Sequence, residues 1–172
     1  MSNKGYVLGS APQELQRLIL QDRLILRPIT ERLLSQAGPK EGMRVLDLGC
    51  GTGGVSVLAA EMVGPYGAVV GTDQSVDAIA MAKESSRESG FQQSAFCVSS
   101  VEAFSSPDPF DIVSGRYVLM YQPSPAAFIR AASRHVLYCM VSSSSLRSSF
   151  VAGLTSNYLV GIPGLASSIS AI

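Results

Sequence analysis

The sequence is poor in the side chains that metal sites and disulfide frameworks need. Its 172 residues contain no tryptophan, one histidine (His135) and three cysteines, at positions 50, 97 and 139. Widely spaced cysteines in odd number indicate neither a disulfide framework nor a CxxC metal site, and one histidine leaves a zinc site without enough ligands. We therefore expect no metal and a reducing compartment, which favours the cytoplasm.

Charge of either sign is also scarce. The chain has 13 Lys or Arg and 13 Asp or Glu, so its formal net charge is zero. There is no basic excess for a phosphate backbone and no polybasic run for an anionic membrane. The first sixteen residues lack the apolar core of a signal peptide. We expect neither nucleic acid nor a membrane as partner, which leaves small molecules; the oligomeric state is not predicted.

Short apolar runs alternate with helical patterns along the middle of the chain. Four runs predict strands, at residues 44–48, 68–72, 94–98 and 110–114. Ser75 and Ser124 stand where side chains cap the first turn of a helix, and Gly64 and Gly90 stand where helices end. Repeated strand–helix alternation predicts an α/β fold, with a Rossmann-like, doubly wound, mostly parallel sheet.

The segment before the first strand reads as helical. Ser10 and Gln13 have the spacing of a capping box, and apolar residues follow at helical spacing as far as Leu33. Pro28 interrupts this pattern, which predicts two helical pieces or one kinked helix ending near Gly38. We divide the chain into a helical leader (1–40), a ligand-binding domain (41–141) and a tail (142–172).

The strongest local signal is VLDLGCGTGG, residues 45–54. Glycines between a strand and a helix allow a tight turn and the close approach of a ligand. The spacing of Gly49, Gly51 and Gly54 also fits the dinucleotide fingerprint. Asp47, however, is expected at the lip of this loop, where its carboxylate would repel a pyrophosphate at the helix N-terminus. The carboxylate suits a cationic ligand, and S-adenosylmethionine carries an ammonium and a sulfonium but no phosphate.

Three motifs in order give a resemblance to a known family. VLDLGCGTG resembles the first motif of class I S-adenosylmethionine-dependent methyltransferases, and VVGTDQS resembles the second. FDIVSGRYVLMYQPSPAAFIRAASRHV resembles the fourth strand with its helix, and YVLGSAPQELQRLILQDRL resembles the leader of the small-molecule enzymes. The resemblance covers about residues 6–136. It implies S-adenosylmethionine as cofactor and methyl transfer to an O, N or C nucleophile of a small molecule.

The resemblance also implies a cofactor site at the carboxyl ends of the strands. Its members are Asp47, Gly49, Cys50, Gly51, Asp73, Gln74, Ser100, Val101 and Arg116. In the family, the glycines line the methionine part, and the acid at the position of Asp47 contacts its amino end. Asp73 takes the ribose hydroxyls and Gln74 lies beside the adenine.

Some of these positions depart from the family's residues, and others have an alternative structural role. Ser100 and Val101 stand where the family often has Asp-Ala near the adenine amino group. Arg116 falls near the cofactor and the substrate mouth. Either aspartate can alternatively serve as a loop or capping residue, and we expect Asp73 to contribute little to stability. No catalytic base is assigned.

The C-terminal end departs from the family pattern. Residues 136–172 contain ten serines and a single charged residue, Arg147. Residues 136–141 are compatible with a fifth strand, but the rest shows no strand alternation, so the terminal strands of the seven-stranded sheet are expected to be missing or abnormal. We favour a truncated, mis-spliced or frame-shifted product; the alternatives are an apolar segment on the open sheet edge or a partner, and a membrane anchor.

Two alternative functions stay open at this stage. One is a nicotinamide-dependent oxidoreductase, because Asp73 follows Gly54 by 19 positions, as in dinucleotide-binding folds. Asp47 and the lack of a Tyr-x-x-x-Lys pair count against it. The other is a non-catalytic methyltransferase-like protein, which the unusual tail suggests.

Overall fold

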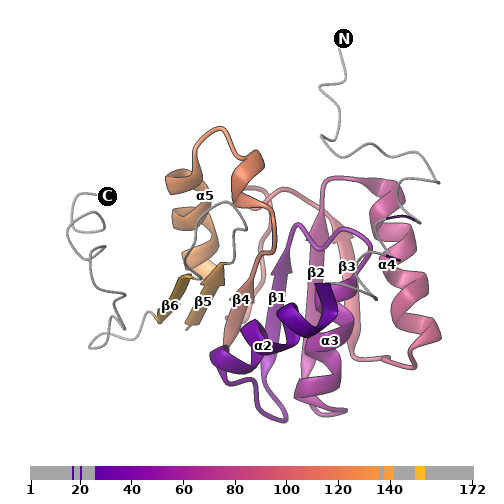
Figure 1. The fold of residues 1–172 in the computed structure, drawn as a ribbon. Helices are drawn as coiled ribbons and strands as arrows, with labels where there is room; N and C mark the ends of the chain where they lie inside the picture. The colour runs from indigo at the N-terminus through magenta and orange to yellow at the C-terminus, as the bar shows by residue number, and fades with distance from the viewer. Residues whose placement is uncertain (1–16, 18–19, 21–25, 136–137, 142–149, 154–172) are drawn as a thin grey trace.

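A twisted sheet forms the centre of the protein in the computed structural model, which describes residues 17, 20, 26–135, 138–141 and 150–153 (Figure 1). The strand order is β3-β2-β1-β4-β5-β6. The strands are β1 Arg44–Leu48, β2 Ala68–Asp73, β3 Ser94–Val98, β4 Ile112–Ser114, β5 Tyr138–Val141 and β6 Phe150–Gly153. The first five run parallel, and β6 is antiparallel to β5. The α/β, Rossmann-like prediction is confirmed.

The C-terminal strands differ in part from the expectation. β5 falls inside the run that was compatible with a fifth strand. β6 lies in the serine-rich segment, where no further strand was predicted. The division of the chain at residues 40 and 141 stays a prediction, because most of the leader and of the tail, including the capping box at Ser10, lies outside the described residues.

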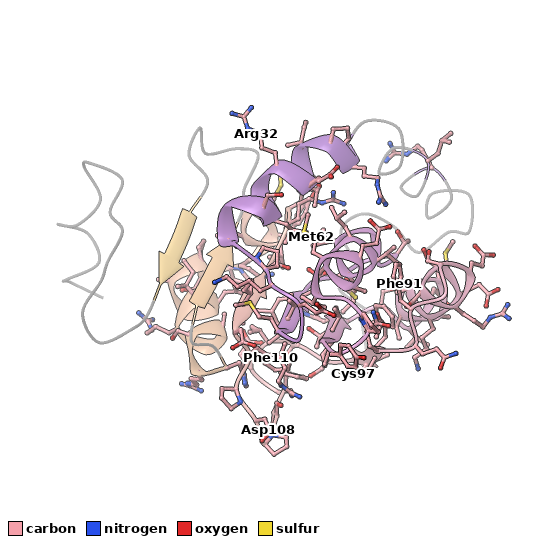
Figure 2. All side chains as sticks on the ribbon, turned by 90° about the horizontal axis from the view of Figure 1, so that it is seen from below. Arg32, Met62, Phe91, Cys97, Asp108 and Phe110 are labelled. Atoms are coloured by element: carbon pink, nitrogen blue, oxygen red, sulfur yellow. The ribbon has the colours of Figure 1, made fainter. Side chains whose placement is uncertain are left out.

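Helices cover both faces of the sheet. They are α2 Arg27–Ala37, α3 Gly54–Val63, α4 Val76–Glu88 and α5 Pro125–Ala132, with short 3₁₀ turns η2 Leu119–Tyr121 and η3 Ser133–His135. Side chains of β1 alternate between the faces: Leu46 packs with Phe128 of α5, whereas Val45 packs with Leu34 of α2. Figure 2 shows α2 with Met62 beside it on one side of the molecule, and Phe110 toward the other.

Helix boundaries follow the local chemistry of the sequence. The Ser75 hydroxyl accepts a hydrogen bond from the Ala78 N–H at 3.2 Å, which confirms the predicted cap of α4. The Ser124 hydroxyl caps α5 in the same way. α2 has Pro28 in its first turn, where a missing N–H costs nothing, and it ends at Gly38 in the left-handed conformation.

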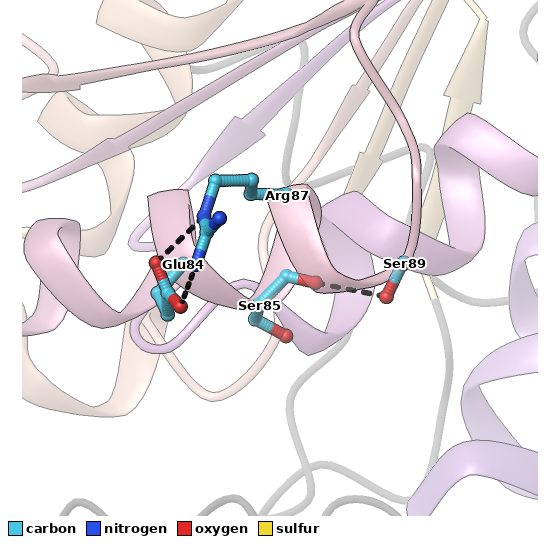
Figure 3. A network of polar contacts seen from close by, with 4 residues as sticks. All are labelled: Glu84, Ser85, Arg87 and Ser89. Atoms are coloured by element: carbon cyan, nitrogen blue, oxygen red, sulfur yellow. Dashed lines mark hydrogen bonds and ion pairs between the residues drawn. The ribbon is translucent and has the colours of Figure 1, made fainter.

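The outer face of α4 is solvent-exposed and carries no site residue. Figure 3 shows Glu84 paired with Arg87 one turn on, and the Ser89 hydroxyl donating to the Ser85 carbonyl at 2.8 Å. Both partners of the ion pair are more than half exposed, so the pair adds little to stability. Within the described part of the chain, no helix is both long enough and apolar enough to cross a membrane.

Candidate functional site

A glycine loop joins the carboxyl end of β1 to α3. Gly49, Gly51 and Gly53 have φ angles of 67°, 55° and 88°, the left-handed region that disfavours other residues. A Cβ on Gly49 would lie 2.8 Å from Cγ2 of Val118, and one on Gly53 would lie 3.1 Å from Cα of Ala82. The loop is therefore held between the segment that follows β4 and helix α4, and both contacts require glycine.

Asp73, at the end of β2, fixes this loop from the side. Its Oδ2 accepts the Gly51 N–H and its Oδ1 accepts the Ser75 N–H, each at 2.9 Å. The residue is only 6% exposed. The carboxylate thus ties the glycine loop to the start of α4, which counts against the expectation that Asp73 contributes little to stability. Each carboxylate oxygen keeps a second lone pair for a ligand hydroxyl.

Asp47 lies beneath the loop and not at its lip. Its Oδ2 accepts from the Ser56 hydroxyl at 2.6 Å and its Oδ1 from the Ser114 hydroxyl at 3.0 Å, and the residue is 1% exposed. Burial raises the pKa of Asp47 to about 6; the two hydroxyls and the Arg116 guanidinium oppose the rise, and Asp73 adds to it. Ionisation of this buried carboxylate therefore lowers the free energy of unfolding.

Arg116, whose charge acts on this carboxylate, is hydrogen-bonded to α2 on the leader side of the protein. Its Nη1 donates to the Thr30 hydroxyl at 2.6 Å, and that hydroxyl donates to the Leu26 carbonyl at 2.8 Å. Arg116 also lies 5.6 Å from the centre of the Tyr117 ring. Arg116 was expected near the site, but Thr30 was not predicted, since no local signal links residues 86 positions apart.

The ends of β2 and β3 form the next part of the site. Asp73 is paired in register with Val98, whose apolar side chain is 49% exposed. Gln74 is exposed beside them. Val98 thus offers an apolar surface to a ligand, and Asp73 and Gln74 offer polar groups beside it.

Two other predicted positions turn their side chains into the core. Cys50 packs with Ile79 and Phe96 and is 7% exposed, and burial raises the pKa of its thiol. Val101 is 5% exposed and belongs to the cluster that packs under α5. Neither side chain is therefore presented to a ligand, and the Cys50 N–H and carbonyl already bond to Thr72 and Gly53. The neighbouring Ser100 hydroxyl accepts from the Ala103 N–H at 3.3 Å and so closes a turn.

His135 lies away from this group of residues. Its carbonyl accepts from the Phe110 N–H at 2.7 Å, next to the amino end of β4, whereas Ser114 ends that strand at the site. Its ring contacts Phe104 edge-on, and burial lowers its pKa. Among the residues that the structure describes, no cluster of His, Cys, Asp and Glu could hold a metal ion.

A glycine loop bordered by aspartates at the ends of two adjacent parallel strands is the arrangement of class I S-adenosylmethionine-dependent methyltransferases. A family model described as "Methyltransferase domain" matches residues 39–157, more than half of the chain, and the chain belongs to that family. An S-adenosylmethionine-dependent methyltransferase from Aquifex aeolicus shares the fold, with a TM-score of 0.62 and 22% identity over 77% of this chain and 71% of that protein.

Two relatives are more similar in sequence. Aklanonic acid methyltransferase DauC of a Streptomyces strain is 36% identical over 97 residues, which is 56% of this chain and 44% of that enzyme. The ubiquinone biosynthesis O-methyltransferase of Thiobacillus denitrificans is 34% identical over 112 residues, 64% of this chain and 47% of that enzyme. The chain thus spans less than half the length of these relatives. The resemblance to the methyltransferases is confirmed, and the oxidoreductase alternative is set aside.

The raised pKa of Asp47 predicts an unusual pH dependence of stability. The folded value, about 6, lies above the ordinary 3.8, so the neutral carboxyl favours folding. This contribution is complete below the ordinary value and is lost as the pH rises through about 6. Asp47→Asn removes the titration. Between pH 4 and pH 7.5 the free energy of unfolding of the wild type should fall by roughly 2 kcal/mol relative to the variant.

Urea unfolding of both proteins at several pH values measures this difference. The other carboxyl groups are common to the two proteins, so their contributions cancel. Parallel stability profiles would show that burial of Asp47 does not raise its pKa in solution.

Proposed function

We propose that this chain binds S-adenosylmethionine at the carboxyl ends of β1, β2 and β3 and transfers its methyl group to a small molecule. The observation that carries the proposal is the Asp73 carboxylate, which holds the glycine loop at Gly51 while it keeps lone pairs for a diol. Family membership and the fold agree with this assignment.

The residues present fit the parts of this cofactor. Asp73 would accept the two ribose hydroxyls, and the exposed Val98 and Gln74 beside it would contact the adenine face and edge. The glycine loop allows close approach of the methionine part, because Gly49 and Gly51 carry no side chain. Asp47 would act on the ammonium group through its field from beneath the loop, since its oxygens already accept two hydroxyl bonds.

Cys50, Ser100 and Val101 complete the proposed binding residues; Cys50 would contact the cofactor by shape alone, because its N–H donates to the Thr72 carbonyl and its carbonyl accepts from the Gly53 N–H. Their side chains are committed elsewhere, to the core or to a local turn. At Ser100, where the family often has an acid, the hydroxyl accepts the Ala103 N–H and keeps a second lone pair for the adenine edge, a weaker acceptor than a carboxylate. The proposal therefore places most of the binding free energy at the ribose and the methionine ends.

When bound, the cofactor supplies a methyl group on a cationic sulfur: the lone pair of an acceptor bonds to the methyl carbon, and the electrons of the C–S bond return to sulfur. The protein contributes mainly positioning and a suitable field. The acceptor's proton leaves to solvent or to a base that we do not assign. The name of the ubiquinone biosynthesis relative specifies an O-methyltransferase, which supports an oxygen acceptor.

The segment after β4 is placed to shape the acceptor's entrance. Tyr117 has a φ of 61°, the one positive value outside glycine among the described residues, and such strain concentrates at functional sites. Its neighbour Val118 contacts Gly49, so the strained residue lies directly beside the loop. Met120 and Tyr121, in η2, are 47% and 38% exposed and offer apolar contact to an aromatic acceptor.

Methyl transfer tests the proposal directly. The purified chain is incubated with methyl-tritiated S-adenosylmethionine and a panel of small phenols and carboxylic acids, and label is counted in the organic extract. We expect label in at least one oxygen acceptor, and none with Asp73→Ala at the same cofactor concentration. Tight cofactor binding without transfer to any acceptor would instead support a non-catalytic protein.

A further inference from the structure

Thr30 is a polar residue of α2 whose interactions lead to the cofactor site. It is only 4% exposed, although it is a threonine on a helix at the edge of the molecule. Its hydroxyl uses both of its capacities: it donates to the Leu26 carbonyl and accepts from Nη1 of Arg116. A threonine that only satisfied itself within its helix would make the first of these bonds and not the second.

Arg116 is related to Asp47 by its position after β4 and by its charge. Arg116 follows β4 directly, two residues after Ser114, whose hydroxyl donates to Asp47. The Arg116 guanidinium acts on the Asp47 carboxylate electrostatically. A guanidinium on a long side chain has many rotamers, and a fixed acceptor such as Thr30 limits them.

We propose that Thr30 is a positioning residue of the cofactor site: by accepting a hydrogen bond from Arg116 it keeps that guanidinium near the Asp47 carboxylate. The docking of α2 is thereby coupled to the charge beside the methionine part of the cofactor. The expected effect on cofactor affinity rests on the proposed function. The expected effect on the pKa of Asp47 concerns the free protein and does not.

The groups that face Asp47 define what such coupling changes. From α3 and β4 come the neutral hydroxyls of Ser56 and Ser114, from β2 the carboxylate of Asp73, and from the segment after β4 the guanidinium of Arg116. Arg116 is thus the cation among the partners that act on Asp47, and it opposes both burial and Asp73. Release of Arg116 from Thr30 shifts Asp47 toward its neutral form.

Thr30→Val keeps the shape of the side chain but removes the acceptor. We follow the Asp47 carboxyl by carbon NMR in the free protein between pH 4 and pH 9, and expect its midpoint to rise by up to about half a unit in this variant, because the Arg116 charge acts less strongly on Asp47 than burial and the two hydroxyls do. Thr30→Ser should restore the wild-type midpoint. Ser35→Ala is the matched control, because it deletes a hydroxyl that donates to the Glu31 carbonyl in the same helix without reaching Arg116.

Cofactor affinity supplies the second measurement. If only the ionised Asp47 attracts the ammonium group, a half-unit rise of its pKa from about 6 should weaken S-adenosylmethionine binding roughly twofold at pH 6 and hardly at pH 8. The ratio of variant to wild type at each pH cancels the titration of the ligand's own groups. Calorimetry with Thr30→Val, Thr30→Ser and the wild type gives these ratios.

The outcomes separate the inference from the proposed function. An Asp47 midpoint that does not move in Thr30→Val, or a loss of affinity equal at both pH values, would overturn the positioning role. A midpoint that rises, with rescue by Thr30→Ser, supports it even if α2 loses some stability. Failure of the wild type to bind S-adenosylmethionine at any pH would refute the proposed function and not the link from Thr30 to Asp47.

Discussion

Replacing Asp73 with alanine should weaken S-adenosylmethionine binding at least about a hundredfold. The proposed role has two ribose hydroxyls donating to one carboxylate, and a hydrogen bond to a charged acceptor contributes about 1.5–3 kcal/mol. Each bond is therefore worth roughly a tenfold change or more. The free energy of unfolding should fall as well, by about 1–3 kcal/mol, because the N–H groups of Gly51 and Ser75 lose their acceptor.

Calorimetric titration and urea unfolding of the same preparation measure the two effects. Asp73→Asn keeps one acceptor oxygen, so both losses should be smaller than with alanine. Asp77→Ala, at an exposed acid in the first turn of α4, controls for the loss of one negative charge nearby. A large loss of stability with unchanged affinity would show that Asp73 stabilises the fold and does not bind the cofactor.

Gly49→Ala should damage both the fold and the site. The residue has a φ of 67°, where a side chain costs about 1–2 kcal/mol. Its Cβ would also meet Cγ2 of Val118 at 2.8 Å, which forces the segment after β4 to move. We expect a loss of stability of roughly 2–4 kcal/mol in total, together with a loss of cofactor affinity of at least about tenfold.

Gly38→Ala separates the two parts of this effect. Gly38 has a φ of 66°, almost the same as Gly49, but nothing lies within 4 Å of the Cβ that alanine would add. Its replacement should cost the backbone strain alone and leave cofactor affinity unchanged. Equal losses of stability at the two glycines would show that Val118 yields without resistance, and the loop would then be less tightly held than the distances indicate.

The sheet and its helices could be predicted because their signals are local. Four strands were placed from short apolar runs, and the cap at Ser75 was read from the residue itself and found as a hydrogen bond. β6 could not be predicted, because its pairing with β5 supplies the ordering that its own serine-rich surroundings do not. Asp47 beside the glycine loop favoured a cationic ligand over a pyrophosphate, and the resemblance of three motifs to the methyltransferases implied S-adenosylmethionine.

The directions of individual side chains were harder to predict. Asp47 was expected at the lip of the loop, but the two-residue period of β1 points it to the α3 face, under the loop and next to Ser56. The Val101 side chain is buried in the core for a different reason: it is apolar, and an apolar side chain is stabilised by burial. Thr30 was missed because its partner Arg116 is distant in sequence and adjacent only in the fold.

Calorimetric titration of the purified chain with S-adenosylmethionine tests the central claim most directly, with S-adenosylhomocysteine and NAD⁺ as comparison ligands. The account predicts that both adenosyl ligands bind with one site per chain and that NAD⁺ does not compete. The Asp73 carboxylate and the glycine loop serve the first two, and the charge of Asp47 disfavours a pyrophosphate at the N-terminus of α3. No heat of binding at millimolar S-adenosylmethionine, or tighter binding of NAD⁺, would contradict it.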